Sequence, residues 1–111
     1  MAYNPELAAR MRSTISTFAQ ATEKKMFGGV CFLVNGYMAC GVYGDGMIVR
    51  VGEAAYADCI RKPHVRAFDL TGRPMKGWVF VDPPGYADED VFSAWVATGI
   101  DFAANLPPKE K

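Results

Sequence analysis

The middle of the chain groups its hydrophobic residues into three short runs, at positions 30–34, 37–43 and 47–51. Each run is rich in β-branched and aromatic residues and carries almost no charge, which is typical of β-strands. Asn35-Gly36 and Asp45-Gly46 separate the runs, and both dipeptides tolerate the positive φ angles of a two-residue hairpin turn. The pattern therefore predicts a three-stranded antiparallel meander around which the other elements are organised.

The two turns also predict a register, and with it two faces of the meander. The first turn places Cys31 opposite Cys40. The second turn places Tyr43 opposite Ile48. Because side chains alternate along a strand, one face is compact and apolar and carries Cys31, Leu33, Met38, Cys40, Val42, Val49 and Val51. The other face is aromatic with one charge and carries Val30, Phe32, Val34, Tyr37, Ala39, Gly41, Tyr43, Ile48 and Arg50. We expect helices to cover the compact face and a partner to meet the aromatic face.

Helical patterns flank the meander. Apolar residues recur at helical spacing before it, at Leu7, Met11, Ile15 and Phe18. With Asn4 as the N-cap, they predict a helix over residues 5 to about 22. After the meander, the pattern predicts a short helix over residues 54 to about 61, strands at 65–70 and 78–82, and a final helix capped by Asp88.

This order of elements indicates an α+β fold in two layers. Helices, strands and hairpin connections follow as helix, three strands, helix, two strands, helix, which favours helices packed on one face of a mostly antiparallel sheet. At 111 residues the chain fits one domain, and we assign residues 1–106 to it and 107–111 to a frayed tail.

Composition excludes several classes of protein. The formal net charge is zero, so the chain as a whole has no electrostatic attraction for nucleic acid. No apolar run is long enough to span a membrane, and the N-terminus does not resemble a signal peptide. Three cysteines without metal-like spacing indicate a reducing, cytoplasmic environment. We therefore expect no metal and no cofactor.

Cys31 and Cys40 are the most interesting candidates for chemistry. In the predicted register their Cα atoms lie about 4.5 Å apart, within disulfide range, so a redox dithiol stays open. The favoured interpretation is two buried thiols, because burial in apolar surroundings raises a thiol pKa and slows its reactions. The single histidine, His64, has no evident catalytic partners, so we assign no catalytic residue.

Two segments carry a resemblance to a known family. Residues 24–29 read Lys-Lys-Met-Phe-Gly-Gly and precede a predicted strand and Asn35-Gly36. Residues 68–78 read Phe-Asp-Leu-Thr-Gly-Arg-Pro-Met-Lys-Gly-Trp. Both resemble signatures of the TfoX N-terminal domain family, also called Sxy, and the resemblance covers almost the whole chain. It implies a fold similar to that of secretion chaperones, with the same order of helices and strands.

The resemblance also implies a class of function. Named members of the family regulate natural competence in bacteria by assisting a transcription factor, and they carry a second, C-terminal helical domain. For this chain the resemblance implies a stand-alone N-terminal domain that is cytosolic and binds a protein, with a transcription factor as one candidate partner. It supplies no catalytic residue that matches a position of this sequence.

We predict a non-enzymatic regulatory or adaptor domain that binds protein through the sheet or the turn at 73–78, and that forms a homodimer. The predicted interaction residues are Phe32, Tyr37, Tyr43, Arg50, Arg73, Lys76 and Trp78. One alternative is a small-molecule-binding domain or enzyme with a cleft near Phe27, Gly28 and Trp78. Another is contact with nucleic acid through basic residues interleaved with aromatic ones, although such residues are more often a solvated face. Those basic residues are Arg61, Lys62, Arg66, Arg73 and Lys76.

Overall fold

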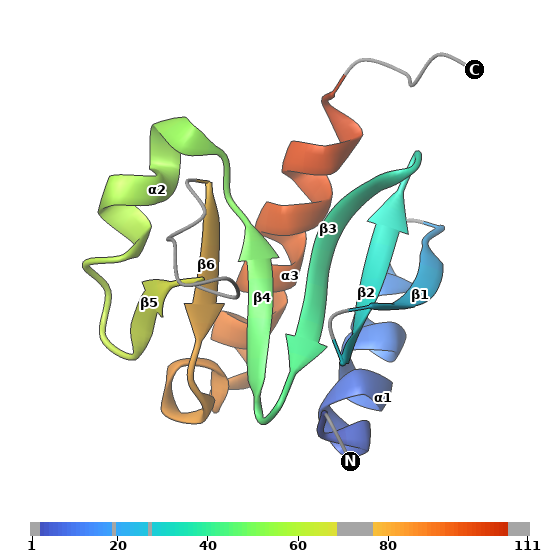
Figure 1. Cartoon of the computed structure of the whole chain (residues 1–111), viewed down its shortest axis with the longest axis horizontal. Coiled ribbons are helices and arrows are strands. Elements are labelled where there is room, and N and C mark those ends of the chain that lie inside the picture. The colour runs from blue at the N-terminus through green and yellow to red at the C-terminus, as the bar shows by residue number, and fades with distance from the viewer. Residues whose placement is uncertain (1–2, 19, 27, 69–76, 107–111) are drawn as a thin grey trace.

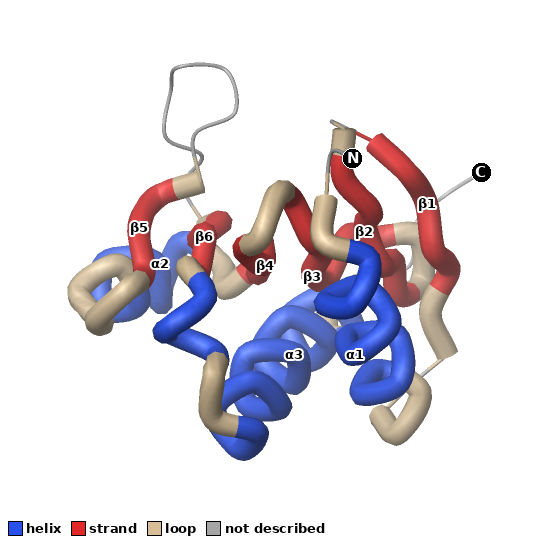
Figure 2. The backbone as a smooth tube through the Cα atoms, turned by 90° about the horizontal axis from the view of Figure 1, so that it is seen from below, coloured by secondary structure: helices blue, strands red, loops and turns tan. Residues whose placement is uncertain are grey.

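The computed structural model describes residues 3–18, 20–26, 28–68 and 77–106. Its elements are α1 (Pro5–Ile15), β1 (Thr22–Met26), β2 (Gly29–Val34), β3 (Tyr37–Tyr43), β4 (Gly46–Arg50), α2 (Glu53–Cys59), β5 (Val65–Ala67), β6 (Trp78–Val81), the 3-10 helix η1 (Pro83–Tyr86) and α3 (Glu89–Ala104). The described strands form one antiparallel sheet of six, in the order β1-β2-β3-β4-β6-β5. α1 and α3 cover one face of this sheet, whereas α2 lies at the edge formed by β5 and β6 (Figure 1, Figure 2). The predicted α+β fold is confirmed.

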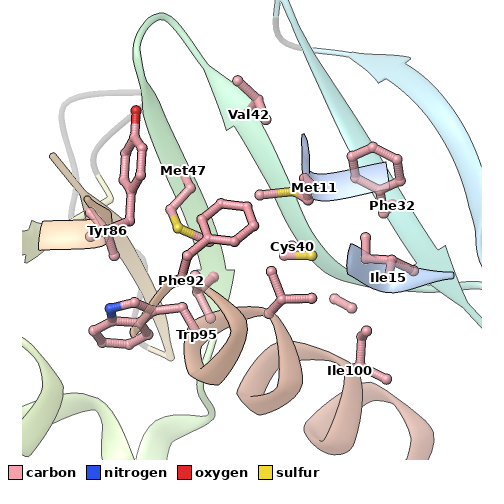
Figure 3. Packing of buried hydrophobic residues seen from close by; sticks show 14 of the residues in the cluster. Met11, Ile15, Phe32, Cys40, Val42, Met47, Tyr86, Phe92, Trp95 and Ile100 are labelled. Carbon is pink, nitrogen blue, oxygen red and sulfur yellow. The ribbon is translucent and has the colours of Figure 1, made fainter. Parts of the chain in front are cut away.

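The hydrophobic core lies between the sheet and the two helices α1 and α3 (Figure 3). From α1 it takes Leu7, Ala8, Met11 and Ile15, which include most of the predicted helical stripe. From α3 it takes Phe92, Trp95, Val96, Ile100 and Ala103. Asn4 and Asp88 cap these helices as predicted, since the side-chain oxygen of each accepts hydrogen bonds from two backbone N–H groups of the first turn.

The first helix ends much earlier than the apolar spacing predicts. The hydroxyls of Ser16 and Thr17 donate to the carbonyls of Ser13 and Thr14 at 2.7 Å, and such bonds compete with continuation of a helix. Phe18, expected on the buried stripe, is instead 49% exposed. The chain is thereby free to turn back toward the sheet.

The strand β1, which the sequence did not predict, follows this early helix end. It pairs with β2 along Thr22–Met26 and forms one edge of the sheet. Its sequence, Thr-Glu-Lys-Lys-Met, shows no alternation of apolar and polar residues. Charged residues are common on edge strands because they oppose pairing with other chains, so the usual hydrophobic signal for a strand is absent here.

A bulge at Ala39 changes the predicted faces of the meander. The predicted pairing holds beside the first turn, but Phe32 then lies opposite Cys40 instead of Ala39. The extra residue reverses the orientation of β2 relative to the rest of β3. The interpretation of Phe32 as a surface residue is therefore wrong. Its side chain is 2% exposed and lies beside Met11 and Ile15 of α1 (Figure 3).

The bulge divides the predicted faces into a correct and an incorrect part. The prediction is correct for β4 and for the part of β3 after the bulge. The core includes Cys40 and Val42 of β3, Val49 of β4, and Val51, which follows β4. On β2 the assignment is reversed, and the core residues are Val30, Phe32 and Val34. Alternation then places Cys31 and Leu33, together with Met38, on the face without helices.

Gly99 explains how α3 packs against this bulge. A Cβ atom at this position would lie 2.3 Å from the carbonyl oxygen of Ala39. Glycine in a helix interior is normally unfavourable, yet α3 runs without interruption from Glu89 to Ala104. The glycine instead allows the helix backbone to approach the bulged strand closely.

The second hairpin turn is displaced by one residue. Tyr43 lies opposite Gly46, so the turn residues are Gly44 and Asp45, and Gly44 has a φ of +59°. A Cβ atom on Gly46 would fall 2.1 Å from the ring of Phe80, so this glycine belongs to the strand and makes room for the ring. The predicted pairing of Tyr43 with Ile48 is wrong by two residues. An even shift leaves every side chain on its predicted face.

Candidate functional site

Three of the predicted interaction residues meet at one end of the sheet. β3 begins at Tyr37, β4 ends at Arg50 and β6 begins at Trp78, and Arg50 lies directly opposite Trp78. In Figure 1 the three strand ends lie in the upper part of the view. The end of β4 and the start of β6 are neighbours there, and the C-terminal half of α3 lies between them and the start of β3. Phe102 of α3 completes the group. We call Tyr37, Arg50, Trp78 and Phe102 the Arg50 cluster.

The guanidinium group of Arg50 is at the centre of this cluster. Its Cζ atom lies 5.0 Å from the ring centroid of Trp78, 5.2 Å from that of Phe102 and 5.9 Å from that of Tyr37. All four residues are partly exposed. Each ring is within the distance of a cation–π interaction, which contributes about 0.5–2 kcal/mol depending on desolvation. The rings therefore hold a cation at the surface in a defined position.

Backbone contacts fix the strand ends that carry the cluster. The N–H groups of Val51 and Gly52 both donate to the carbonyl of Gly77, at 2.8 and 3.0 Å. Gly52 has a φ of +87°, and a Cβ atom there would lie 2.4 Å from the Phe102 ring. Glycine at this position therefore satisfies the backbone conformation and leaves space for the ring.

Arg50 has no acidic partner within the described residues. No carboxylate in that part of the chain has an oxygen within 4.0 Å of the Arg50 guanidinium nitrogens. Among the predicted interaction residues, Arg73 and Lys76 lie outside the residues described, so the structure assigns them no place.

Tyr43 belongs to a separate group on the face without helices. We call Tyr43, Arg66, Phe68 and Phe80 the Phe80 cluster. The ring of Phe68 meets Tyr43 edge to face at 6.3 Å and stacks on Phe80 at 6.4 Å. Arg66 lies 4.8 Å from the Phe80 ring centroid and 3.2 Å from a carboxylate oxygen of Asp82. Because these rings cover one another, much of the aromatic surface expected for a partner is already buried within the chain.

Several residues of the two clusters were not among the predicted interaction residues. Alternation within the predicted strand 78–82 places Phe80 on the same face as Trp78, and this signal was available. The contribution of Phe102 was not predictable from local pattern, because it depends on how α3 crosses the sheet. Phe68 lies beside Trp78 through a 3.4 Å hydrogen bond from its N–H to the Trp78 carbonyl, which is likewise a tertiary contact.

The predicted pairing of Cys31 with Cys40 is also wrong. Cys31 lies opposite Gly41, and the two thiols are on opposite faces of the sheet because of the bulge. Burial raises the pKa of Cys31 to about 11 and that of Cys40 to about 12, so both stay protonated near neutral pH. Both cysteines are free and buried, which agrees with the interpretation of two buried thiols.

A groove lies elsewhere, between the end of α1 and the strands β1 and β2, with a volume of about 670 Å³. Neither Gly28 nor Trp78 lines it. On its rim, Arg12 donates two hydrogen bonds to Glu23, at 2.6 and 2.8 Å, and these lower the pKa of the Glu23 carboxyl. The described residues contain no group of three His, Cys, Asp or Glu side chains that could hold a metal ion.

Comparison with known proteins identifies one family. The model of the TfoX N-terminal domain family matches residues 13–103, a span that includes the whole Arg50 cluster. Neither the curated proteins nor the solved structures give a significant match. Within the described residues, no helix combines the length and the apolar character needed to cross a membrane.

Proposed function

Because the chain belongs to the TfoX N-terminal domain family, we propose that it is a regulatory or adaptor domain that binds another protein through the Arg50 cluster. The family match supports a domain of the competence or regulatory type, and the family is not a known enzyme family. The finer assignment, a non-enzymatic domain with a cytosolic protein partner, is our proposal. A transcription factor is one candidate for that partner.

The composition of the Arg50 cluster is the observation that carries this proposal. Tryptophan, tyrosine and arginine are the residues most enriched among those that dominate the binding energy of protein interfaces. Here the ring centroids of Trp78 and Tyr37 lie within 6 Å of the guanidinium carbon of Arg50, and all three residues are partly exposed to solvent. The rings are rigid and held by neighbouring strands, so binding would order few additional side-chain torsions.

The charge of the chain supports a protein partner over nucleic acid. The chain has 12 basic residues (lysine plus arginine) and 12 acidic residues (aspartate plus glutamate), so long-range attraction to a phosphate backbone is weak. Among the described residues, those around the Arg50 guanidinium are aromatic rings. One arginine surrounded by aromatic rings is better suited to bind a protein surface than to bind a polyanion.

Site-specific photocrosslinking tests the proposal. p-Benzoylphenylalanine is introduced at Trp78, and at Thr98 on the exposed side of α3 as a matched control, in cells that express the protein natively. We expect a protein crosslink from position 78 that is absent from position 98 and is lost when Arg50→Gln is added. The same crosslinked proteins from both positions, or crosslinks that persist in the Arg50→Gln variant, would contradict a role for the Arg50 cluster.

A further inference from the structure

Among the described residues, Arg50 differs from Arg10, the other partly buried arginine, in having no carboxylate oxygen within 4.0 Å of its guanidinium nitrogens. Arg10 lies 3.5 Å from Glu89, and the more exposed Arg12 and Arg66 lie 2.6 and 3.2 Å from Glu23 and Asp82. Within the described residues, the Arg50 guanidinium instead lies within 6 Å of three aromatic ring centroids. A guanidinium group carries five N–H donors, and a ring that faces its plane does not accept them as an oxygen would. Within the part of the chain that the structure describes, the cluster therefore positions a cation whose N–H donors are available to an external group.

We propose that the Arg50 cluster binds a carboxylate, and that the partner presents an acidic side chain flanked by apolar residues. This inference rests on the proposed function and names the chemistry of the partner. Stacked rings contact the face of a guanidinium, whereas its N–H donors point outward in its plane. A carboxylate in that plane accepts two parallel hydrogen bonds, which is the strongest geometry available to arginine.

The described surroundings of Arg50 offer no carboxylate of the chain itself, and this favours an external one. The two acidic residues nearest in sequence to the cluster are Glu53, which begins α2, and Asp101, which precedes Phe102. Both are exposed, and neither has an oxygen within 4.0 Å of the guanidinium. The apolar edges of Trp78 and Phe102 beside the guanidinium would contact the residues that flank the incoming acid. A guanidinium without a described carboxylate partner, next to apolar ring edges, is the reason to expect an acidic residue with apolar neighbours.

Nuclear magnetic resonance on ¹⁵N-labelled protein tests the inference directly. The probes are an acetylated, amidated hexapeptide of alternating leucine and glutamate, its leucine–glutamine counterpart, and oligothymidylate. We expect the glutamate peptide to shift the Nε–H signal of Arg50 and the indole N–H signal of Trp78, and the glutamine peptide to shift neither. Arg50→Gln should weaken binding at least tenfold, because a hydrogen-bonded charge pair contributes about 1.5–3 kcal/mol.

The control is another arginine that lies over an aromatic ring. Arg66→Gln, in the Phe80 cluster, should change the affinity for the glutamate peptide by less than about twofold, since Arg66 already has Asp82 as its partner. Arg50→Lys provides a second variant that keeps the charge but loses the planar fork, and an intermediate loss is expected. Amide spectra of each variant test whether the fold is retained outside the cluster.

Three results would overturn the inference. They are no shift of the Arg50 and Trp78 signals with the glutamate peptide, equal shifts with the glutamine peptide, or tighter binding of oligothymidylate at the same signals. The last result would point to a phosphate polymer. The outcome is separable from that of the proposed function. If position 78 crosslinks to a protein in an Arg50-dependent manner but the glutamate peptide does not bind, protein binding stands and the carboxylate chemistry is wrong.

Discussion

Replacing Gly99 with alanine separates the effect of helix propensity from that of packing. Gly99 lies inside α3, where alanine is normally the better residue by about 1 kcal/mol. If propensity alone mattered, Gly99→Ala would stabilise the protein. The structure predicts the opposite sign, because the added methyl group would point into the bulge of β3 at Ala39.

The size of the effect follows from the distances around the missing Cβ atom. This atom would lie 2.3 Å from the carbonyl oxygen of Ala39 and 3.0 Å from its carbonyl carbon. Real Cβ atoms essentially never approach a heavy atom closer than 3.0 Å, so α3 and β3 must separate by at least 0.7 Å, the difference between 3.0 and 2.3 Å. The obstacle is backbone and cannot move aside as a flexible side chain would. Overpacking costs about 3 kcal/mol at the upper end of its usual range, which leaves a net destabilisation of about 2 kcal/mol after the propensity gain.

Urea unfolding followed by circular dichroism measures this difference. For a slope of about 1.5 kcal/mol/M, a loss of about 2 kcal/mol lowers the midpoint by about 1.3 M. Ala94→Gly, at an exposed position of the same helix, serves as the control and should cost about 1 kcal/mol from propensity alone. A Gly99→Ala variant that is as stable as the wild type or more stable would refute the close contact between α3 and the bulge.

Three further predictions concern other parts of the molecule. Glu23→Gln should cost about 0.5 kcal/mol near pH 7. Because Arg12 lowers the pKa of Glu23 in the folded state, this loss of stability should disappear as the pH falls through that pKa. A difference in unfolding free energy between wild type and Glu23→Gln that stays constant with pH, measured by urea unfolding, would contradict the prediction. A disulfide exchange reagent near pH 8 should leave Cys31 and Cys40 unreacted until urea unfolds the protein, whereas rapid reaction of more than one thiol in the native state would show that burial is incomplete. Sedimentation equilibrium should give a homodimer that Tyr43→Asp weakens, and a monomer at every concentration would contradict self-association through the sheet.

Local sequence chemistry predicted the framework of the fold but not the contacts that assemble the candidate site. Turn dipeptides, alternation and helix caps gave the order of the elements other than β1 and η1. Tyr37, Arg50 and Trp78 were among the predicted interaction residues. They could not show that β4 pairs with β6, because strand order in a sheet depends on long-range contacts. Phe102 was missed for the same reason. β1 was missed because an edge strand made of charged residues has no hydrophobic pattern to detect.

The bulge at Ala39 connects the error in the predicted faces to the existence of the Arg50 cluster. Without the extra residue, regular alternation would place Tyr37 on the same face of β3 as Tyr43, the face without helices. The bulge reverses this at the start of β3, so that Tyr37 packs against the main core. Trp78 approaches the Arg50 guanidinium from the sheet, and Phe102 approaches it from the helix layer. Gly99 allows α3 to pack closely against the bulge. This contact therefore also determines which rings surround the guanidinium of Arg50.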